Sequence, residues 1–487
     1  MSDQNNLLII MSDEHAADAM GCAGHALAHT PTLDALAARG ARFTNAYTPS
    51  PICVPARAAF HTGRPIHETS YWSSAEPYDG RVPTWGHAVR AAGRRCASVG
   101  KLHFRSSEDD NGFAPELLPM HVVGGIGWAE GLLRDPMPDY RDHARELADD
   151  VGTGESSYTR YDRAITERAC RWLKTEAQAD ARPFTLFVSL VSPHYPLTAP
   201  AEHAAHFDPA KMPLPHHVEG HLDHPVLSAM REFWCYGDYF DEARIREARA
   251  AYLGLVSFLD ANVARILSSL DDAGLADTTT VLYASDHGEL LGNHGFWTKS
   301  LMYEDSVRVP LIMAGPRVPS GAVCDAPVSL LDLYPTVLDA MAVPQTTDAP
   351  TGPLAGTSLF ETIRTPSPDR TVFSEYHDGG SPTGFFMIRW DRWKYIHYVG
   401  ARPQLFDLQD DPREHRDLGK STEHAEILGE GEARLHAILD PIAVNTRAFA
   451  DQRERLEAWG GPEGIANLVR FNHTPVPDLS ADPTTSQ

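Results

Sequence analysis

Short apolar runs alternate with longer amphipathic stretches through the first two thirds of the chain. The runs have the length and composition of buried strands and lie at 6–11 (NLLIIM), 95–100 (RCASVG), 183–192 (PFTLFVSLVS), 278–285 (TTTVLYAS) and 309–315 (VPLIMAG). The stretches between them predict helices at 31–39, 84–93, 158–178 and 242–272. Strands that alternate with helices predict an α/β layered fold with a large, mostly parallel central sheet.

From about residue 345 the pattern changes. The turn-rich segment 346–356 (TTDAPTGPLAG) predicts a linker or crossing loop. Short strand candidates follow at 371–376, 385–390, 393–398 and 404–408, with helical stretches at 422–438 and 448–460. We therefore divide the chain into a large domain at 1–345 and a smaller C-terminal α+β subdomain with an antiparallel sheet at 346–487, whose tail from Thr474 is expected to be mobile.

Four of the predicted strands in the large domain end in polar or charged residues. The residues are Asp13, Lys101 with His103, His194, and Asp286 with His287. In open α/β sheets the ligand lies outside the carboxyl ends of the strands. The sequence therefore predicts a functional site where these strand ends meet.

Asp13, Asp286 and His287 offer oxygen and imidazole donors from different strand ends, which together suit one hard divalent cation. A single Asp at a strand end more often caps a helix or loop, but convergence of two strand ends favours the metal. Glu14 is a further ligand or a support for the ligands. Calcium fits this donor set, and manganese fits it nearly as well.

The chain has 487 residues and a formal net charge of −24, which disfavours nucleic acid and anionic membranes as partners. It has no long apolar run that predicts a membrane span, and its N-terminus lacks the features of a secretory signal, so we expect a cytoplasmic protein. An acidic protein that binds an anion needs a local positive pocket. The candidates are Arg57, Lys101, His103, His194 and Lys299, although any one of them alone is as well explained as a surface or core residue.

Six cysteines stand at 22, 53, 96, 170, 235 and 324, without a C-x-x-C pair, so we expect neither a thiolate zinc site nor disulfides. Cys53 differs, because it lies at a predicted helix start in SPICVPARAAFHTGR (50–64), near Arg57. Such a setting is expected to lower the thiol pKa. However, the C-x-P-x-R spacing is too short for a cysteine phosphatase loop, and sulfur is a poor ligand for a hard cation.

A resemblance explains the role of Cys53. The chain resembles the type I sulfatases of the alkaline phosphatase superfamily. The resemblance rests on LLIIMSDEH, on C-x-P-x-R followed by T-G-R, on GKLHF and SPHYP, and on SDHGELLGNHGFWTKS far downstream. It implies an alkaline-phosphatase-like fold and oxidation of Cys53 to Cα-formylglycine by a formylglycine-generating enzyme. Ala56 stands where the family commonly has Ser, which leaves the Cys, Pro and Arg of the modification motif in place.

The resemblance also implies roles for the site residues. One divalent metal ion would be held by Asp13, Cys53 in its modified form, Asp286 and His287, and the modified residue would attack sulfur to give a covalent sulfo-enzyme. The remaining roles fall to the basic residues. Arg57, Lys101 and Lys299 would stabilise the charged oxygens, His194 with Lys299 would protonate the leaving alcohol, and His103 would accept the proton that releases sulfate.

Within the family the chain is most similar to choline sulfatases, related cytosolic arylsulfatases, and phosphonate monoester hydrolases. The phosphonate monoester hydrolases have neutral hydroxyl residues in place of the K-x-H element, which in this chain is Lys101 and His103. The resemblance therefore favours sulfate esters as substrates. A choline pocket would need an aromatic cage, for which Trp72, Trp128 and Trp297 are candidates, and the tail lacks the expected aromatic-acidic element.

We therefore expect a sulfuric ester hydrolase acting on an aryl or alkyl sulfate, in a homo-oligomer (dimer or tetramer), with the leaving group held by the loops at 104–160 and 200–240. Two alternatives stay open: a phosphonate monoester or phosphodiester hydrolase using the same site, and an anion-binding protein in which Cys53 remains a thiol.

Overall fold

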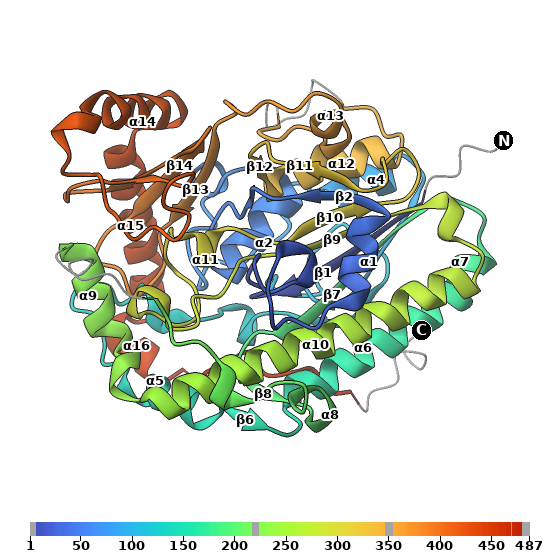
Figure 1. The fold of residues 1–487 in the computed structure, drawn as a ribbon, viewed down its shortest axis with the longest axis horizontal. Helices are drawn as coiled ribbons and strands as arrows, with labels where there is room; N and C mark the ends of the chain where they lie inside the picture. The colour runs from blue at the N-terminus through green and yellow to red at the C-terminus, as the bar shows by residue number, and fades with distance from the viewer. Residues whose placement is uncertain (1–5, 217–223, 346–353, 469, 480–487) are drawn as a thin grey trace.

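One eight-stranded sheet forms the centre of the computed structural model, which describes residues 6–216, 224–345, 354–468 and 470–479. The strands lie in the order β11, β2, β10, β9, β1, β7, β4, β5 (Figure 1). Their bounds are β1 Asn6–Asp13, β2 Gly40–Phe43, β4 Arg95–Lys101, β5 Glu116–Met120, β7 Phe184–Pro193, β9 Thr279–Ser285, β10 Leu311–Ala314 and β11 Ala322–Cys324.

The five adjacent strands β9, β1, β7, β4 and β5 are parallel to one another. Strand β10 is antiparallel to both of its neighbours, β9 and β2. The prediction of a large, mostly parallel sheet is confirmed. The parallel strands β1, β4, β7 and β9 end at the same edge, and each is followed there by polar residues. This shared edge is the place where the sequence predicts a site.

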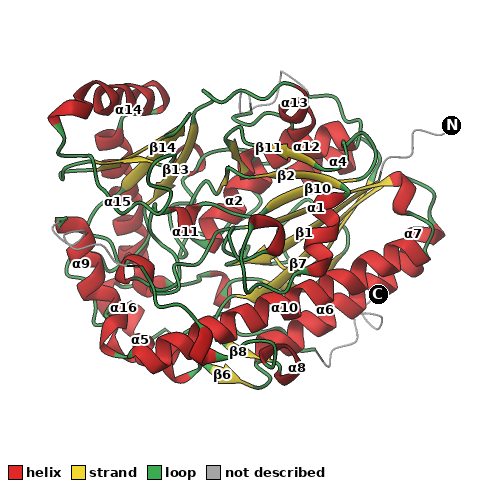
Figure 2. Ribbon diagram, in the orientation of Figure 1, coloured by secondary structure: helices red, strands yellow, loops and turns green. Residues whose placement is uncertain are grey.

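Helices cover both faces of the sheet, which explains why its strands are apolar throughout rather than alternating (Figure 2). Leu8 and Ile10 pack on one face with α1 Pro31–Ala38, α6 Ser157–Lys174 and α10 Glu242–Asp272. Leu7 and Ile9 pack on the other with α2 Cys53–Thr62, α4 Trp85–Ala91 and α12 Leu333–Ala340. Because successive side chains of a strand point to opposite faces, one run of residues serves both cores.

Helix α10 has the length and mean hydropathy of a membrane span, at 31 residues and 1.3 over its most apolar stretch. However, 83% of that stretch is buried inside the protein, where the helix packs against α6 and β7. Its apolar character is that of a core helix.

The C-terminal part forms a second, antiparallel sheet in the order β13 Val372–Tyr376, β14 Phe385–Trp390, β15 Trp393–Tyr398 and β16 Gln404–Asp407. It lies beside the central sheet with α14 Ala425–Ile438 and α15 Pro441–Ala458 (Figure 1). The predicted antiparallel sheet is confirmed. The predicted start of the last long helix at 448 is wrong, because Asp440 accepts hydrogen bonds from the backbone of Ile442 and Ala443 and starts α15 at Pro441.

Most of the predicted linker, residues 346–353, lies outside the described residues. Beyond it, side chains of β13 and β14 share one apolar core with Tyr47 and with residues of α9 and α10.

The single helix predicted at 158–178 is divided at Thr175 into α6 and α7. The remaining helices are α3 Ile66–Thr69, α5 Arg141–Asp149, α7 Glu176–Ala179, α8 Ala201–Ala204, α9 Pro225–Trp234, α11 Glu304–Val307, α13 Leu359–Arg364 and α16 Gly461–Ala466, and the short strands are β3 Ala46–Tyr47, β6 Gly152–Thr153, β8 Thr198–Ala199 and β12 Val328–Ser329.

Candidate active site

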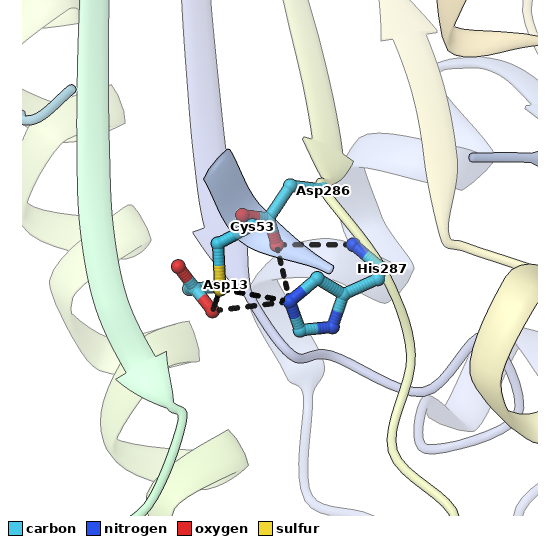
Figure 3. A group of neighbouring side chains, drawn as sticks. All are labelled: Asp13, Cys53, Asp286 and His287. Carbon is cyan, nitrogen blue, oxygen red and sulfur yellow. Dashed lines mark hydrogen bonds and ion pairs between the residues drawn. The ribbon is translucent and has the colours of Figure 1, made fainter. Parts of the chain in front are cut away.

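Four buried side chains converge at the carboxyl edge of the sheet: Asp13 from the end of β1, Cys53 from the first turn of α2, and Asp286 and His287 after β9 (Figure 3). One atom of each lies within 4.8 Å of the others. His287 Nε2 is 3.1 Å from Cys53 Sγ and 3.7 Å from one carboxylate oxygen of each Asp. The structure thus brings together the four residues that the sequence predicts as metal ligands.

Arg57 lies behind the two carboxylates rather than facing the pocket. Its Nε donates to Asp286 Oδ2 at 2.8 Å, its second terminal nitrogen to Asp13 Oδ2 at 3.1 Å, and its first to Lys101 O and Ser189 Oγ. All its nitrogens are engaged, so this geometry differs from the expected direct grip on a substrate anion. Its position suits it to fix the outer oxygens of Asp13 and Asp286 and aim the inner ones at the centre.

Lys101 completes this support. Its Nζ forms an ion pair with Asp13 Oδ2 at 2.5 Å in a site where neither side chain is exposed. Burial alone would raise the pKa of Asp13, but the charges of Lys101 and Arg57 hold it well below its ordinary value. The carboxylate therefore stays ionised, as a metal ligand must.

His287 is held in the tautomer that a metal ligand requires. Its Nδ1 donates to the carbonyl oxygen of Gly288 at 3.0 Å, which leaves the lone pair of Nε2 directed at the centre. The outer hydrogen bond fixes both the protonation pattern and the ring plane.

The expected lowering of the Cys53 thiol pKa is wrong. Although Cys53 is the first residue of α2, complete burial raises its pKa, and the adjacent Asp13 raises it further. Lys299 and Lys101 oppose this only in part. As an unmodified residue Cys53 is therefore a neutral thiol rather than a thiolate nucleophile.

A second polar group lies beside the centre. Lys299 Nζ donates to Glu14 Oε2 at 2.9 Å and to His194 Nε2 at 2.8 Å. His194 Nδ1 donates to Tyr195 O at 2.6 Å, so Nε2 is the acceptor and His194 is neutral. Burial lowers the pKa of His194, and Lys299 lowers it further, whereas burial would lower the pKa of Lys299 but Glu14 raises it. The Glu14 carboxylate is thus engaged with Lys299, while its backbone N–H donates to Asp286 Oδ1 at 3.3 Å.

His103 faces the pocket as a neutral base. Burial lowers its pKa well below the ordinary value, and the neighbouring Lys101 and Arg57 add to this. Neither ring nitrogen has a hydrogen-bond partner in the described part of the chain. A buried imidazole without a partner is costly, so both ring nitrogens are available to hydrogen-bond with a molecule bound in the cavity.

Four residues around the site have left-handed backbone conformations that side chains other than glycine disfavour. Their φ values are 66° at Glu14, 55° at His103, 62° at Thr298 and 81° at Ser300. Each costs about 1–2 kcal/mol, and such residues gather where the surrounding structure enforces a functional geometry. Glu14 directly follows Asp13, Thr298 and Ser300 flank Lys299, and His103 lies two residues after Lys101.

A cavity of about 100 Å³ opens above Cys53, and its walls are aromatic. His103, His194 and Lys299 line its inner end. The wall residues are Trp128, Tyr140, Tyr158, Tyr195, Trp234 and Tyr236, together with the C-terminal segment from Phe471 to Thr474. Five of these aromatics come from the loops at 104–160 and 200–240, where the sequence predicts leaving-group contacts but identifies only Trp128.

Two expectations about the walls change. Trp72 and Trp297 do not line this cavity, because Trp72 Nε1 donates to Asp451 and Trp297 stacks on Phe240 with ring centroids 4.0 Å apart. The tail expected to be mobile begins at Thr474, which is buried and whose carbonyl oxygen accepts from Tyr158 at 2.9 Å. Residues 480–487 of that tail lie outside the described residues.

The centre fits a hard divalent cation. Two ionised carboxylates and a correctly oriented imidazole provide three suitable donors, and the fourth position is Cys53. A neutral thiol is the one donor that does not match. An oxygen-bearing residue at 53 would make the set consistent.

The chain is similar in sequence to known sulfatases. Residues 5–343 match the family model described as Sulfatase, and residues 292–440 match the one described as N-sulphoglucosamine sulphohydrolase, C-terminal. Choline-sulfatase of Rhizobium meliloti (strain 1021) is 32% identical over 85% of this chain and 82% of its own. Arylsulfatase K of Danio rerio is 30% identical over 94% of this chain and 88% of its own.

Solved structures share the fold. A phosphonate monoester hydrolase of Agrobacterium radiobacter has a TM-score of 0.70 and 22% identity, covering 89% of this chain and 95% of that one. A structure in complex with its substrate D-glucosamine-2-N,6-O-disulfate has a TM-score of 0.72 and 22% identity, covering 92% and 98%. The fold is the alkaline-phosphatase-like fold that the sequence predicts.

Proposed function

The chain belongs to the sulfatase family, and from this premise we propose that it hydrolyses sulfate monoesters with a formylglycine at position 53 and one divalent metal ion. The observation that carries the proposal is the convergence of Asp13, Asp286, His287 and residue 53 at the floor of a cavity whose inner end holds Lys299, His194 and His103.

The chemistry of the floor supports a modified residue 53. A hydrated aldehyde at this position would offer a hydroxyl as nucleophile for sulfur, and a calcium or manganese ion would supply the charge that lowers the pKa of that hydroxyl. Asp13, Asp286 and His287 would hold the ion, and Arg57 keeps both carboxylates oriented. A formylglycine-generating enzyme is then a partner during maturation.

Lys299 and His194 are assigned to the leaving alcohol. Lys299 is the proton source, since its Nζ lies 2.8 Å from the neutral His194 Nε2 and both side chains line the cavity. Glu14 holds the ammonium in place through its 2.9 Å contact. Proton transfer to the departing oxygen prevents an alkoxide from forming.

His103 and Lys101 are assigned to sulfate release. His103 accepts a proton at a ring nitrogen from residue 53 as sulfate leaves, because it is neutral and has no hydrogen-bond partner in the part of the chain that the structure describes. Lys101 and Lys299 add the positive charge that favours anionic sulfate oxygens in a protein of net charge −24.

The walls favour an aryl or otherwise apolar alcohol as leaving group. Seven Trp, Tyr and Phe side chains line the cavity, and no carboxylate lines it among the described residues. Aromatic faces suit a flat ring. A quaternary ammonium would gain cation–π contacts but no counter-charge here, so a choline ester is the weaker fit.

One second activity follows from the same residues. A phosphonate monoester or phosphodiester carries one negative charge, as a sulfate monoester does, and could occupy the same floor. The fold is similar to that of a phosphonate monoester hydrolase, which supports this alternative activity. The presence of both Lys101 and His103 favours sulfate.

The test is a paired measurement of kcat/KM for an aryl sulfate and the matching aryl phosphonate monoester, on converted protein loaded with calcium or with manganese. We expect the sulfate to be preferred by orders of magnitude. A preference for phosphonate would refute the sulfate assignment while leaving the floor intact.

Peptide mass spectrometry of the 50–64 segment tests the remaining alternative, an anion-binding protein in which Cys53 stays a thiol. We expect the aldehyde at position 53 after co-expression with a converting enzyme. An intact thiol together with undiminished binding of inorganic sulfate would identify an anion-binding protein instead, and Cys53→Ala is the control for activity from contaminants.

A further inference from the structure

A second group of metal-binding side chains lies outside the active site. It consists of His216, His294 in the loop after β9, and Asp305 at the start of α11. His216 Nε2 lies 3.3 Å from His294 Nε2 and 3.9 Å from Asp305 Oδ2, and one atom of each residue lies within 4.8 Å of the others. The active-site mechanism uses none of the three.

We propose that this cluster is a binding site for a zinc-class divalent ion. Donor atoms that share a tetrahedral zinc ion at about 2.0–2.1 Å are separated by about 3.3 Å, which is the observed spacing of the two imidazole nitrogens. Two imidazoles and one carboxylate suit zinc or cobalt, whereas the oxygen-rich floor of the active site suits calcium or manganese. The proposal does not depend on the function proposed above.

The local backbone holds the two imidazoles together in advance. His294 N donates to His216 O at 3.1 Å, and His216 N donates to Asn293 Oδ1 at 3.2 Å, so the two segments are interlocked. Gly292 has a φ of 85°, and a Cβ there would lie 2.7 Å from Pro215 Cγ. Only glycine permits this close approach of the segments.

Contacts around the ligands fix their orientation. The ring of Tyr303 stacks on that of His294 with centroids 4.0 Å apart and an interplanar angle of 9°. Asn293 Nδ2 donates to Asp305 Oδ2 at 3.1 Å. Supporting contacts of this kind position ligands at built metal sites.

A fourth ligand of the proposed ion can come from a water molecule in an adjoining cavity or from a nearby histidine. Residues His216 and Asp305 line a cavity of about 230 Å³, which gives access to an ion or a water molecule. His415 lies beside it with its ring 4.9 Å from that of His216, and its buried Nε2 has no hydrogen-bond partner among the described residues. A change of side-chain rotamer could bring this imidazole to the ion.

An ion here would stiffen the loop that carries Lys299 into the active site. That loop is already closed by Glu289, whose Oε1 accepts from Leu291 N and Thr298 N. A bond between His294 and His216 through a metal would hold the loop to a segment far away in sequence. The expected consequence is added stability rather than new chemistry.

The test is titration of cobalt into the protein with its active site preloaded with calcium, followed by visible absorption. We expect one equivalent of cobalt with absorption typical of imidazole and carboxylate ligands. Both His294→Gln and Asp305→Asn should weaken this binding at least tenfold, while Asp286→Asn, which is expected to lose the active-site calcium, should still bind cobalt at the second cluster.

A matched control is His436→Gln, since His436 is exposed on α14. Zinc should raise Tm of the wild type and of this control but not of His294→Gln or Asp305→Asn. The proposal is overturned if either variant binds cobalt as tightly as the wild type, if His436→Gln loses binding equally, or if Asp286→Asn abolishes it.

Discussion

The floor and the walls of the active-site cavity are built in different ways. Asp13, Cys53, Asp286 and His287 are all buried and lie at a strand end, at a helix start or directly after a strand. The walls come from loops, from the first turn of α6, from the end of α9 and from the C-terminal segment 471–474. The difference indicates that the chemistry depends on rigid elements, while the leaving-group contacts depend on loops that can vary without disturbing the floor.

The largest effect should come from residue 53. Cys53→Ser provides one hydroxyl in place of the two of a hydrated aldehyde, so it can form a sulfo-enzyme but cannot release sulfate by losing a proton from a second hydroxyl. Steady-state turnover should fall about 10⁴-fold or more. Rapid-quench kinetics should show at most one equivalent of alcohol, and sustained turnover would exclude the proposed release step.

Removal of the metal ligand should have a similarly large effect on turnover. Asp286→Asn keeps the shape of the side chain but removes the charge paired with Arg57 at 2.8 Å. We expect loss of calcium or manganese, measured by elemental analysis, and a fall in kcat of about 10³-fold or more. Glu68→Gln, on the exposed side of α3, is the matched control; full activity in Asp286→Asn would show that the ion is held elsewhere.

A smaller and more selective effect is expected at the boundary between floor and walls. Lys299→Met removes the ammonium that contacts His194, so loss should reach about 10²–10⁴-fold for esters of poorly acidic alcohols. Nitrophenyl sulfate, whose leaving group needs no proton, should be affected much less. Equal losses across a series of leaving groups would instead assign Lys299 to sulfate binding.

Changes in the walls should act on binding alone. Trp234 stacks near Trp128 and Tyr236 and lines the cavity without touching the floor. Trp234→Ala should raise KM for aryl sulfates about tenfold with little change in kcat. A fall in kcat with unchanged KM would mean that the walls and the floor are not separable.

The smallest effect on turnover should follow a change in the C-terminal sheet, at Glu375. This buried carboxylate contacts His67 Nδ1 at 2.9 Å and His377 Nε2 at 3.0 Å. Burial would raise its pKa, but His67 and His377 lower it from 4.5 to about 2. The stabilisation is therefore present above about pH 4.5 and is lost as the pH falls towards 2.

The pKa of His67 changes in the opposite direction, because Glu375 raises it above 6.5 despite burial, so its contribution is lost as the pH rises. Glu375→Gln should thus lower the free energy of unfolding by about 3 kcal/mol at pH values between roughly 4.5 and 6.5. At lower and at higher pH the difference between the variant and the wild type should be smaller. Tm measured against pH checks this, with Glu457→Gln on the exposed side of α15 as a surface control. A constant difference in Tm at all pH values would contradict the ionic account.

Much of the fold could be read from the sequence because local pattern and tertiary environment agree there. The run from Leu7 to Met11 is apolar at every position, and both faces of β1 are in fact buried. The start of α15 was missed because its capping residue, Asp440, lies beyond the expected boundary. The direction of β10 could not be predicted, since an isolated apolar run does not encode whether its neighbours are parallel.

For the site, the sequence by itself determined which residue types stand at the carboxyl ends of the strands, because strand ends and the C-x-P-x-R motif are local features. Only the tertiary structure decided what each residue does. It directed the guanidinium of Arg57 to the carboxylates, raised the pKa of the Cys53 thiol, and placed Thr474 in the wall of the cavity. Such outcomes depend on burial and on neighbours hundreds of residues away in the chain, which no local pattern records.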